Sequence, residues 1–429
     1  MKHFLTSIIC LLAALPLYAS DPREDLNTAM EFYTAGNCID ALPVFEKIIK
    51  SYQLNAEQSY SLNYYAGYCA RHNGDMDLAY GYLHTALDEA IELDETEQIP
   101  VLHMFVEEVQ RERGDYEEAA DHYSQAIALL PDDSADIATA FYFLAETYRL
   151  DQKYEDSVSN CEKAVDIARK LKLISIETSC LTSTGEVYNE MGDYQKAIKT
   201  FTEALTIAHN AQLPLEMANI HLGTGLVYQE LGKNDLARQH YEEALKFYVL
   251  CANVTNIPMI VDRLITLPPC TKAQAARAVE NYRNYAESFS AMGDEDSALY
   301  IQLLVGYYQQ IAEDIEAANT YQQVLSLAIE HNLPYQVYES AVALADVLNT
   351  ESFEDAIEAL VRAQQFDSIQ NPLLYLAKIY AEKGKLYKEH GFYSLAENNY
   401  ANAIASTYTT EDKDDSENAL NDLQNRELK

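Results

Sequence analysis

The sequence predicts an all-helical protein built from about nine or ten repeated helix pairs. Three observations lead to this prediction. A small residue, a bulky residue four positions later and a small or apolar residue seven positions later recur with a period of about 39 residues. Glycines recur five residues before the small residue in many copies. Apolar residue types make up 48% of the 429 residues, which is enough for an extended helical core.

The second helix of each predicted pair carries the small residue, which we call the repeat alanine. Offsets of four and seven residues keep side chains on one face of a helix, so each copy presents one packing face. The repeat alanine is a serine in one copy. The ten positions are Ala41, Ala79, Ala119, Ser157, Ala197, Ala237, Ala278, Ala317, Ala356 and Ala396.

The first helix of each pair is predicted from small and aromatic residues upstream of the repeat alanine. In clear copies a glycine stands twelve residues before it, as Gly185 does, and an aromatic residue nine before, as Tyr188 does. A glycine five before, such as Gly74 or Gly192, should end the helix because glycine tolerates the left-handed cap conformation. An Asp often follows this glycine and can cap the second helix.

These positions together resemble the tetratricopeptide repeat, and the resemblance extends over residues 21–405. The chain has no Trp, although the family often has one in the first helix, and its period exceeds the family's usual length. It is therefore similar to the long-repeat variant of kinesin light chains and some bacterial regulators. The resemblance implies an α-α superhelix, a solenoid whose concave groove is lined by the first helices and holds a peptide from a partner. The best copy contains Gly185, Tyr188, Gly192, Ala197 and Phe201.

Residues 251–300 interrupt the pattern. Pro268 and Pro269 stand where the first helix of the seventh repeat should end, and proline stops a helix. A competing register begins at Ala286. We therefore expect a kink, a slipped helix pair or a boundary in this stretch.

Residues 1–20 predict a secretory signal peptide. Lys2 precedes an apolar run from Phe4 to Leu15, and small residues for cleavage follow at Ala19 and Ser20. The run of roughly 12 residues is too short to span a bilayer. An uncleaved N-terminal anchor is the alternative. Because Cys10 lacks the small residue of a lipoprotein signal before it, we expect a secreted or periplasmic bacterial protein without a membrane span in the mature chain.

The charge excludes some partners. The chain has 30 basic and 68 acidic residues, a net charge of −38, which argues against nucleic acid because phosphate binding needs an excess of Lys and Arg. Such a chain repels itself and should be a soluble monomer. The acidic segment 406–429 is predicted to be a flexible tail.

No sequence motif for catalysis, a cofactor or a metal is found. Phosphate-binding glycine loops, HExxH and GxSxG are absent, and no two cysteines have the short spacing of a zinc site. The ten histidines are scattered along the chain. We therefore expect a non-enzymatic protein without catalytic, cofactor-binding or metal-binding residues.

The predicted partner-binding residues lie eight positions before the repeat alanine, where a side chain usually faces the groove. Three successive repeats have an arginine there, which could bind acidic side chains or a free carboxylate of a partner. The alternative is that Glu108 and Glu146 pair with the arginines three residues later. Aromatic residues and a histidine should lie on the same surface. The predicted groove residues are Arg71, Arg111, Arg149, Tyr64, Tyr68, His72 and Tyr142.

Six cysteines remain after the predicted cleavage, and four of them suggest disulfides. The separation in sequence between Cys161 and Cys180 equals that between Cys251 and Cys270. The first pair falls on neighbouring helices, so a disulfide is feasible, although a free buried thiol is equally common at such a core position. The second pair flanks the irregular repeat, where a bridge would brace a poorly packed stretch.

The leading functional hypothesis is a scaffold that binds a protein or peptide in its groove outside the cytoplasm. One alternative is a sensory repeat module that acts with a membrane signalling partner. Another is a glycan-binding envelope protein, although such proteins usually stack sugars on Trp, which this chain lacks.

Overall fold

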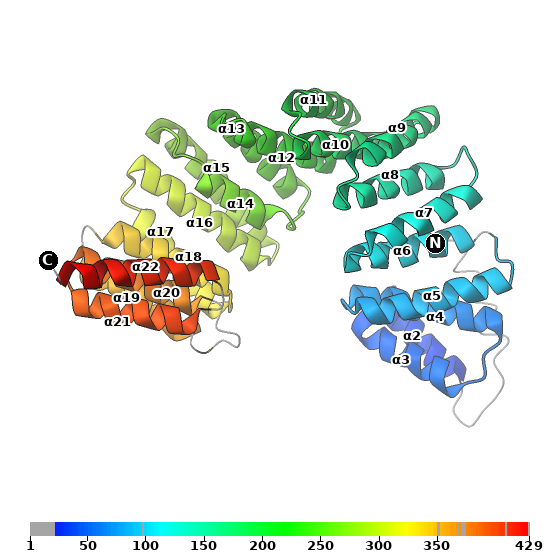
Figure 1. Cartoon of the computed structure of the whole chain (residues 1–429), viewed down its shortest axis with the longest axis horizontal. Coiled ribbons are helices and arrows are strands. Elements are labelled where there is room, and N and C mark those ends of the chain that lie inside the picture. The colour runs from blue at the N-terminus through cyan, green and yellow to red at the C-terminus, as the bar shows by residue number, and fades with distance from the viewer. Residues whose placement is uncertain are drawn as a thin grey trace. The chain divides into compact units, whose positions relative to one another are not determined.

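The computed structural model describes residues 22–96, 98–349, 352–367, 369, 375–407 and 410–427. Within these ranges every regular element is an α-helix, 21 in total, and the helices follow one another as pairs (Figure 1). The predicted fold class is confirmed. The predicted signal peptide lies outside the described residues. The chain divides into two compact units, Met1–Glu216 (unit 1) and Met217–Lys429 (unit 2), with the boundary inside α12 (Pro214–Glu230).

Unit 1 contains five helix pairs among its described residues. In each pair the first helix is even-numbered and the second is odd-numbered. The helices are α2 (Pro22–Thr34), α3 (Cys38–Ser51), α4 (Ala56–His72), α5 (Met76–Glu92), α6 (Ile99–Arg113), α7 (Tyr116–Leu129), α8 (Ala135–Leu150), α9 (Tyr154–Leu171), α10 (Ile174–Glu190) and α11 (Tyr194–Ala211).

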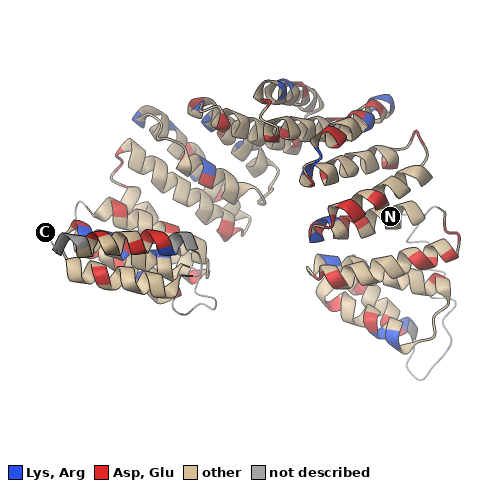
Figure 2. Ribbon diagram, in the orientation of Figure 1, with Lys and Arg blue, Asp and Glu red and all other residues tan. Residues whose placement is uncertain are grey.

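Unit 2 continues the same order from α12. Its further helices are α13 (Asn234–Leu250), α14 (Ile257–Thr266), α15 (Lys272–Ala291), α16 (Glu295–Ala312), α17 (Ala317–Glu330), α18 (Pro334–Leu348), α19 (Phe353–Asp367), α20 (Leu376–Glu389), α21 (Tyr393–Ser406) and α22 (Thr410–Glu427). First helices of successive repeats pack on one another, since α14 contacts α16, α16 contacts α18 and α18 contacts α20. Figure 2 shows acidic residues on helices throughout both units.

The predicted packing register is confirmed by contacts between small and bulky residues. A Cβ atom on Gly185 would lie 2.7 Å from the ring of Phe201, and one on Gly225 would lie 2.6 Å from the ring of Tyr241. Only a glycine leaves room for these buried rings against the first helix. Gly74 has a φ angle of +82°, as expected for the residue that ends α4 and begins the turn to α5.

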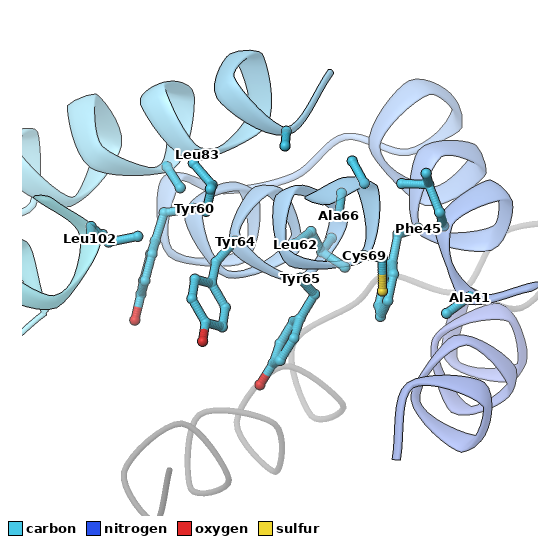
Figure 3. Close-up of a cluster of buried hydrophobic side chains, with 14 of the residues drawn as sticks. Ala41, Phe45, Tyr60, Leu62, Tyr64, Tyr65, Ala66, Cys69, Leu83 and Leu102 are labelled. Carbon is cyan, nitrogen blue, oxygen red and sulfur yellow. The ribbon is translucent and has the colours of Figure 1, made fainter. Parts of the chain in front are cut away.

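Aromatic residues fill the first core of unit 1. Tyr60, Tyr64 and Tyr65 project from α4 on the same side of the helix (Figure 3). Phe45 of α3 is fully buried and stacks on Tyr65 with 5.7 Å between ring centres.

The irregular stretch of unit 2 contains a short helix that a buried arginine supports. Helix α14 has ten residues and ends before the two prolines. Arg238 of α13 is only 4% exposed, and its guanidinium donates to the carbonyl oxygens of Leu264 and Pro268 and to the hydroxyl of Tyr308 at 2.6 Å. The bond to Leu264 satisfies a carbonyl whose helical donor would be residue 268, a proline without an N–H.

Residues Thr410–Glu427 of the acidic segment form the helix α22. Helix α22 packs on α21, and Leu423 is 2% exposed against Ala396 and Tyr400. Leu420 lies one turn before Leu423 and packs on the same cluster. The two leucines give an otherwise acidic helix an apolar edge, and docking rather than composition orders it. No helix in the described ranges is long and apolar enough to cross a membrane.

Candidate partner-binding site

Arg71, the first of the predicted groove arginines, is bound by carboxylates of the next repeat. Its Nη2 lies 2.7 Å from Oε1 of Glu108 and 2.9 Å from Oε1 of Glu112. Both glutamates belong to α6, so the arginine joins the first helices of two successive repeats. The three side chains are each 22 to 33% exposed.

Arg149 repeats this arrangement between α8 and α10. Its guanidinium lies 2.8 Å from Glu146, 3.7 Å from Glu186 and 2.7 Å from Glu190. The two partners on α10 follow Arg149 at the same sequence intervals at which the two partners of Arg71 follow that arginine. Burial alone would lower the pKa of Arg149, but the three carboxylates raise it. These two arginines therefore tie the repeats of unit 1 together.

Arg111 behaves differently from the other two arginines. Its guanidinium carbon lies 5.7 Å from the ring centre of Phe143, a cation–π contact. In the described part of the chain no carboxylate lies within ion-pair distance of it. The expected partner Glu108 is occupied by Arg71. The structure thus contains the internal pair of Glu146 and Arg149. It does not contain the pair of Glu108 and Arg111, because Glu108 binds Arg71 and Arg111 packs on Phe143 instead.

The predicted aromatic groove residues lie on two different first helices, α4 and α8. Tyr64 and Tyr68 both contact Phe105 of α6, with ring centres 5.3 Å and 6.5 Å away. The exposed His72 lies 4.4 Å from the ring of Tyr68. Tyr142 lies on α8, where its ring is 5.2 Å from that of Phe143. Burial raises the pKa of Tyr142, so its hydroxyl stays protonated.

The cysteines of unit 1 form two buried thiol pairs. Cys161 and Cys180 are fully buried in one core cluster, and a hydrogen bond joins their thiols. Cys38 and Cys69 form a second such pair, which the sequence analysis did not find. All four thiols are free in the structure, so the disulfide at Cys161 and Cys180 stays a prediction.

The second predicted pair lies at the irregular repeat of unit 2. Cys251 follows α13 directly, and Cys270 lies between α14 and α15. Both side chains are half-buried. A disulfide between them also remains a prediction.

A cavity of about 910 Å³ in unit 2 is formed by the first helices of four successive repeats, α14, α16, α18 and α20. Its walls combine aliphatic, aromatic and charged side chains. Ile265 comes from α14, Tyr307 and Ile311 from α16, Val342 from α18, and Leu386 from α20. This cavity is a candidate site that the sequence did not reveal.

Nine of the residues that line this cavity stand at three fixed positions in the repeat. They precede the repeat alanine by fourteen, ten and seven residues, which places them on one helical face. The position eight before, from which the groove was predicted, does not have this role in the last three repeats: Gln309 there is fully buried. The nine side chains are Leu303, Tyr307, Gln310, Val342, Asp346, Asn349, Glu382, Leu386 and Glu389.

Glu339 of α18 is a half-buried charged residue of the cavity wall. Burial raises the pKa of its carboxyl, and the nearby carboxylates Asp262 and Glu382 raise it further, while Lys378 lowers it. Among the described residues no Lys, Arg or His lies within 4 Å of its oxygens. Tyr335, on the same helix, donates its hydroxyl to Asp262. The cavity therefore holds a carboxylate that forms no ion pair among the described residues.

Metal binding has no support from the geometry. Within the part of the chain that the structure describes, no three His, Cys, Asp or Glu side chains come together as a metal site. Two histidine pairs do occur at equivalent repeat positions. The Nδ1 atoms of His103 and His122 are 2.9 Å apart, and those of His221 and His240 are 3.0 Å apart. Each pair joins the first and second helices of its own repeat.

Stacked helix pairs with this register of small and bulky residues define a helical-repeat binding scaffold. Models of the tetratricopeptide repeat match residues 26–93, 102–136, 136–208 and 177–248. The chain belongs to the tetratricopeptide repeat family. No curated protein matches its sequence.

Solved structures that match this chain have low sequence identity to it. The apo form of RapI is 15% identical with a TM-score of 0.46, over 70% of this chain and 99% of that one. BtubC (BKLC) from P. vanneervenii is 17% identical with a TM-score of 0.41, over 57% and 92%. MamA from Desulfovibrio magneticus RS-1 is 18% identical with a TM-score of 0.37, over 45% and 98%.

Proposed function

We propose that this protein is a non-enzymatic scaffold outside the cytoplasm and that it binds a peptide segment of a partner protein in the cavity of unit 2. The observation that carries the proposal is the cavity itself. Its wall is the same helical face of three successive repeats, continued by α14. A surface repeated in this way suits a partner that is itself a chain.

The chemistry of the wall supports binding rather than reaction. Apolar side chains such as Leu303, Val342 and Leu386 alternate with polar ones such as Gln310 and Asn349. Such a mixture can bury apolar side chains of a peptide and hydrogen-bond its backbone. The non-enzymatic assignment further rests on the family, whose repeats generally serve as scaffolds.

The location outside the cytoplasm rests on the predicted signal peptide. The test is the N-terminal sequence of the protein purified from its native source. We expect the mature chain to begin at Ser20 or Asp21. A chain that still carries residues 2–19 contradicts cleavage, and one recovered from the cytoplasm contradicts the location.

Peptide binding is tested by selecting random dodecapeptides on the immobilised full-length protein. Ala343 lines the cavity, so the added ring of Ala343→Phe should obstruct it and reduce enrichment. Leu327 is 41% exposed on α17, so Leu327→Phe adds a comparable aromatic ring outside the cavity and should enrich the same peptides as wild type. Failure of the wild type to enrich any peptide, or equal enrichment by Ala343→Phe, would refute the proposal.

A further inference from the structure

We infer that the unit 2 cavity is specific for a basic segment of its partner, with a lysine or arginine side chain of that segment bound by Glu339. The inference rests on the proposed function and adds the chemical class of the partner. It differs from the sequence-based expectation of an acidic partner, which rested on arginines that the structure pairs internally at Arg71 and Arg149.

The first argument is the balance of charge in the cavity. Four carboxylates line it, at Glu339, Asp346, Glu382 and Glu389, against two lysines. Both lysines form ion pairs with glutamates of the same unit. Lys272 pairs with Glu313, and Lys385 lies 3.6 Å from Glu382.

Two further cavity carboxylates, Asp346 and Glu389, have neutral hydrogen-bond donors as their partners among the described residues. Asp346 accepts a hydrogen bond from Gln310 at 3.0 Å, and Glu389 accepts one from Asn349 at 3.1 Å. A neutral amide satisfies an oxygen but does not cancel its charge. The cavity therefore keeps an uncompensated negative charge, which a cation from outside would neutralise.

The second argument is the position of Glu339. It lines the cavity, half-buried, with Asp262 and Glu382 as like-charged neighbours. Lys378 is near enough to lower its pKa, but no cation among the described residues lies within ion-pair distance. A partner's ammonium or guanidinium group would remove the repulsion among these three carboxylates. A charge-assisted bond to a partly buried carboxylate is stronger than one on the open surface.

The third argument is the aromatic surface beside the carboxylates. Tyr335 stacks on Tyr300 with 5.1 Å between ring centres, and Tyr338 stacks on Tyr375 at 4.9 Å. Tyrosine faces attract lysine and arginine side chains and also cover their methylene groups. Carboxylates and tyrosines side by side are a pattern suited to a cationic side chain and unsuited to an acidic one.

The test uses the same dodecapeptide selection, with wild type, Glu339→Gln and Glu358→Gln in parallel. Glu358 is an exposed carboxylate on α19, so its variant loses the same charge away from the cavity. We expect the wild type and Glu358→Gln to enrich sequences rich in Lys and Arg. Selected peptides, labelled with fluorescein, should bind Glu339→Gln at least about tenfold more weakly, with a steep loss of affinity at high salt.

The outcomes separate this inference from the proposed function. Enriched peptides without basic residues, or basic peptides that bind Glu339→Gln as tightly as wild type, overturn the inference and leave peptide binding intact. No enrichment by the wild type overturns both. A third outcome is that spermine binds the wild type but not Glu339→Gln, while no peptide depends on Glu339 for binding. The occupant is then a small cation, and the inference of a basic segment is wrong.

Discussion

A buried carboxyl in unit 1 should make this part of the fold less stable as the pH rises. Glu107 of α6 is 0% exposed. The hydroxyl of Thr147 donates to its Oε1 at 3.3 Å, and its Oε2 has no hydrogen-bond partner among the described residues. Burial raises the pKa of Glu107 to about 9, although the nearby hydroxyl of Tyr123 and the charge of Arg111 oppose the shift.

The sign and size of the effect follow from this pKa. An unfolded chain releases the proton near pH 4.5, whereas the folded chain keeps it until about pH 9. The stability of this region is therefore highest below pH 4.5 and falls as the pH rises toward 9, by about 1.4 kcal/mol per pH unit. At pH 7 the cost is about 3 kcal/mol, and the substitution Glu107→Gln should recover about 2 to 3 kcal/mol of it.

The assay is amide hydrogen exchange of α6 peptides in the full-length protein, with opening free energies corrected for intrinsic rates at pH 6, 7 and 8. Glu107→Gln should raise the opening free energy at pH 7 and flatten its dependence on pH. Glu92→Gln, at an exposed position of α5, should leave both unchanged. A destabilised Glu107→Gln protein, or a wild type whose α6 becomes more stable from pH 6 to 8, would refute the reasoning.

Three further predictions concern packing and charge in both units. Burial, and then the facing histidine of each pair, lowers the pKa of His103 and of His221 to about 4, so acidification from pH 6.5 toward 4 should destabilise the fold. The measurement is the melting temperature between pH 6.5 and 4. Replacement of both histidines by Asn should reduce its fall on acidification, and an unchanged fall would contradict the prediction. Gly225→Ala should cost about 1 to 3 kcal/mol because its Cβ meets a buried ring, whereas Gly81→Ala, with no atom nearby, should stabilise α5 slightly in urea melts. Arg238→Lys should lower the melting temperature of unit 2 because one ammonium cannot reach all three acceptors; an unchanged melt would exclude that role.

The repeat register could be predicted from sequence because it depends on contacts between residues close in the chain. Gly185 and Phe201 belong to consecutive helices and meet within one helix pair. The same spacing recurs at Gly225 and Tyr241, so one physical constraint leaves several copies of its signal. The histidine pairs carry a similar signal. His103 and His221 precede their repeat alanines by the same interval, and an alignment of the repeats on that alanine would have found them.

The ion-pair partners and the final helix could not be predicted because they depend on contacts between repeats. Glu108 is close in sequence to Arg111, yet it binds Arg71 of the preceding repeat. The choice is set by how two first helices pack, which no local spacing reveals. Likewise α22 is acidic along most of its length, and only the docking of Leu423 on α21 orders it.

The cavity was missed because a small rotation of a helix decides which side chains line a groove. A helix turns by about 100° per residue, so the positions seven and eight before the repeat alanine face different directions. Asn349 at the first of these lines the cavity, whereas Leu348 at the second packs into the core of unit 2. The arginines of unit 1 drew attention to the second position, where the charges are conspicuous in sequence but largely paired in the structure.

Site-specific photo-crosslinking in the native host tests the central claim most directly. Benzoylphenylalanine would be introduced at Val342 in the cavity and, as the control, at Leu327 on the exposed side of α17. The account predicts a discrete protein adduct from position 342 and none from position 327. No adduct at position 342, or the same adducts at both positions, would contradict a partner bound in the cavity of unit 2.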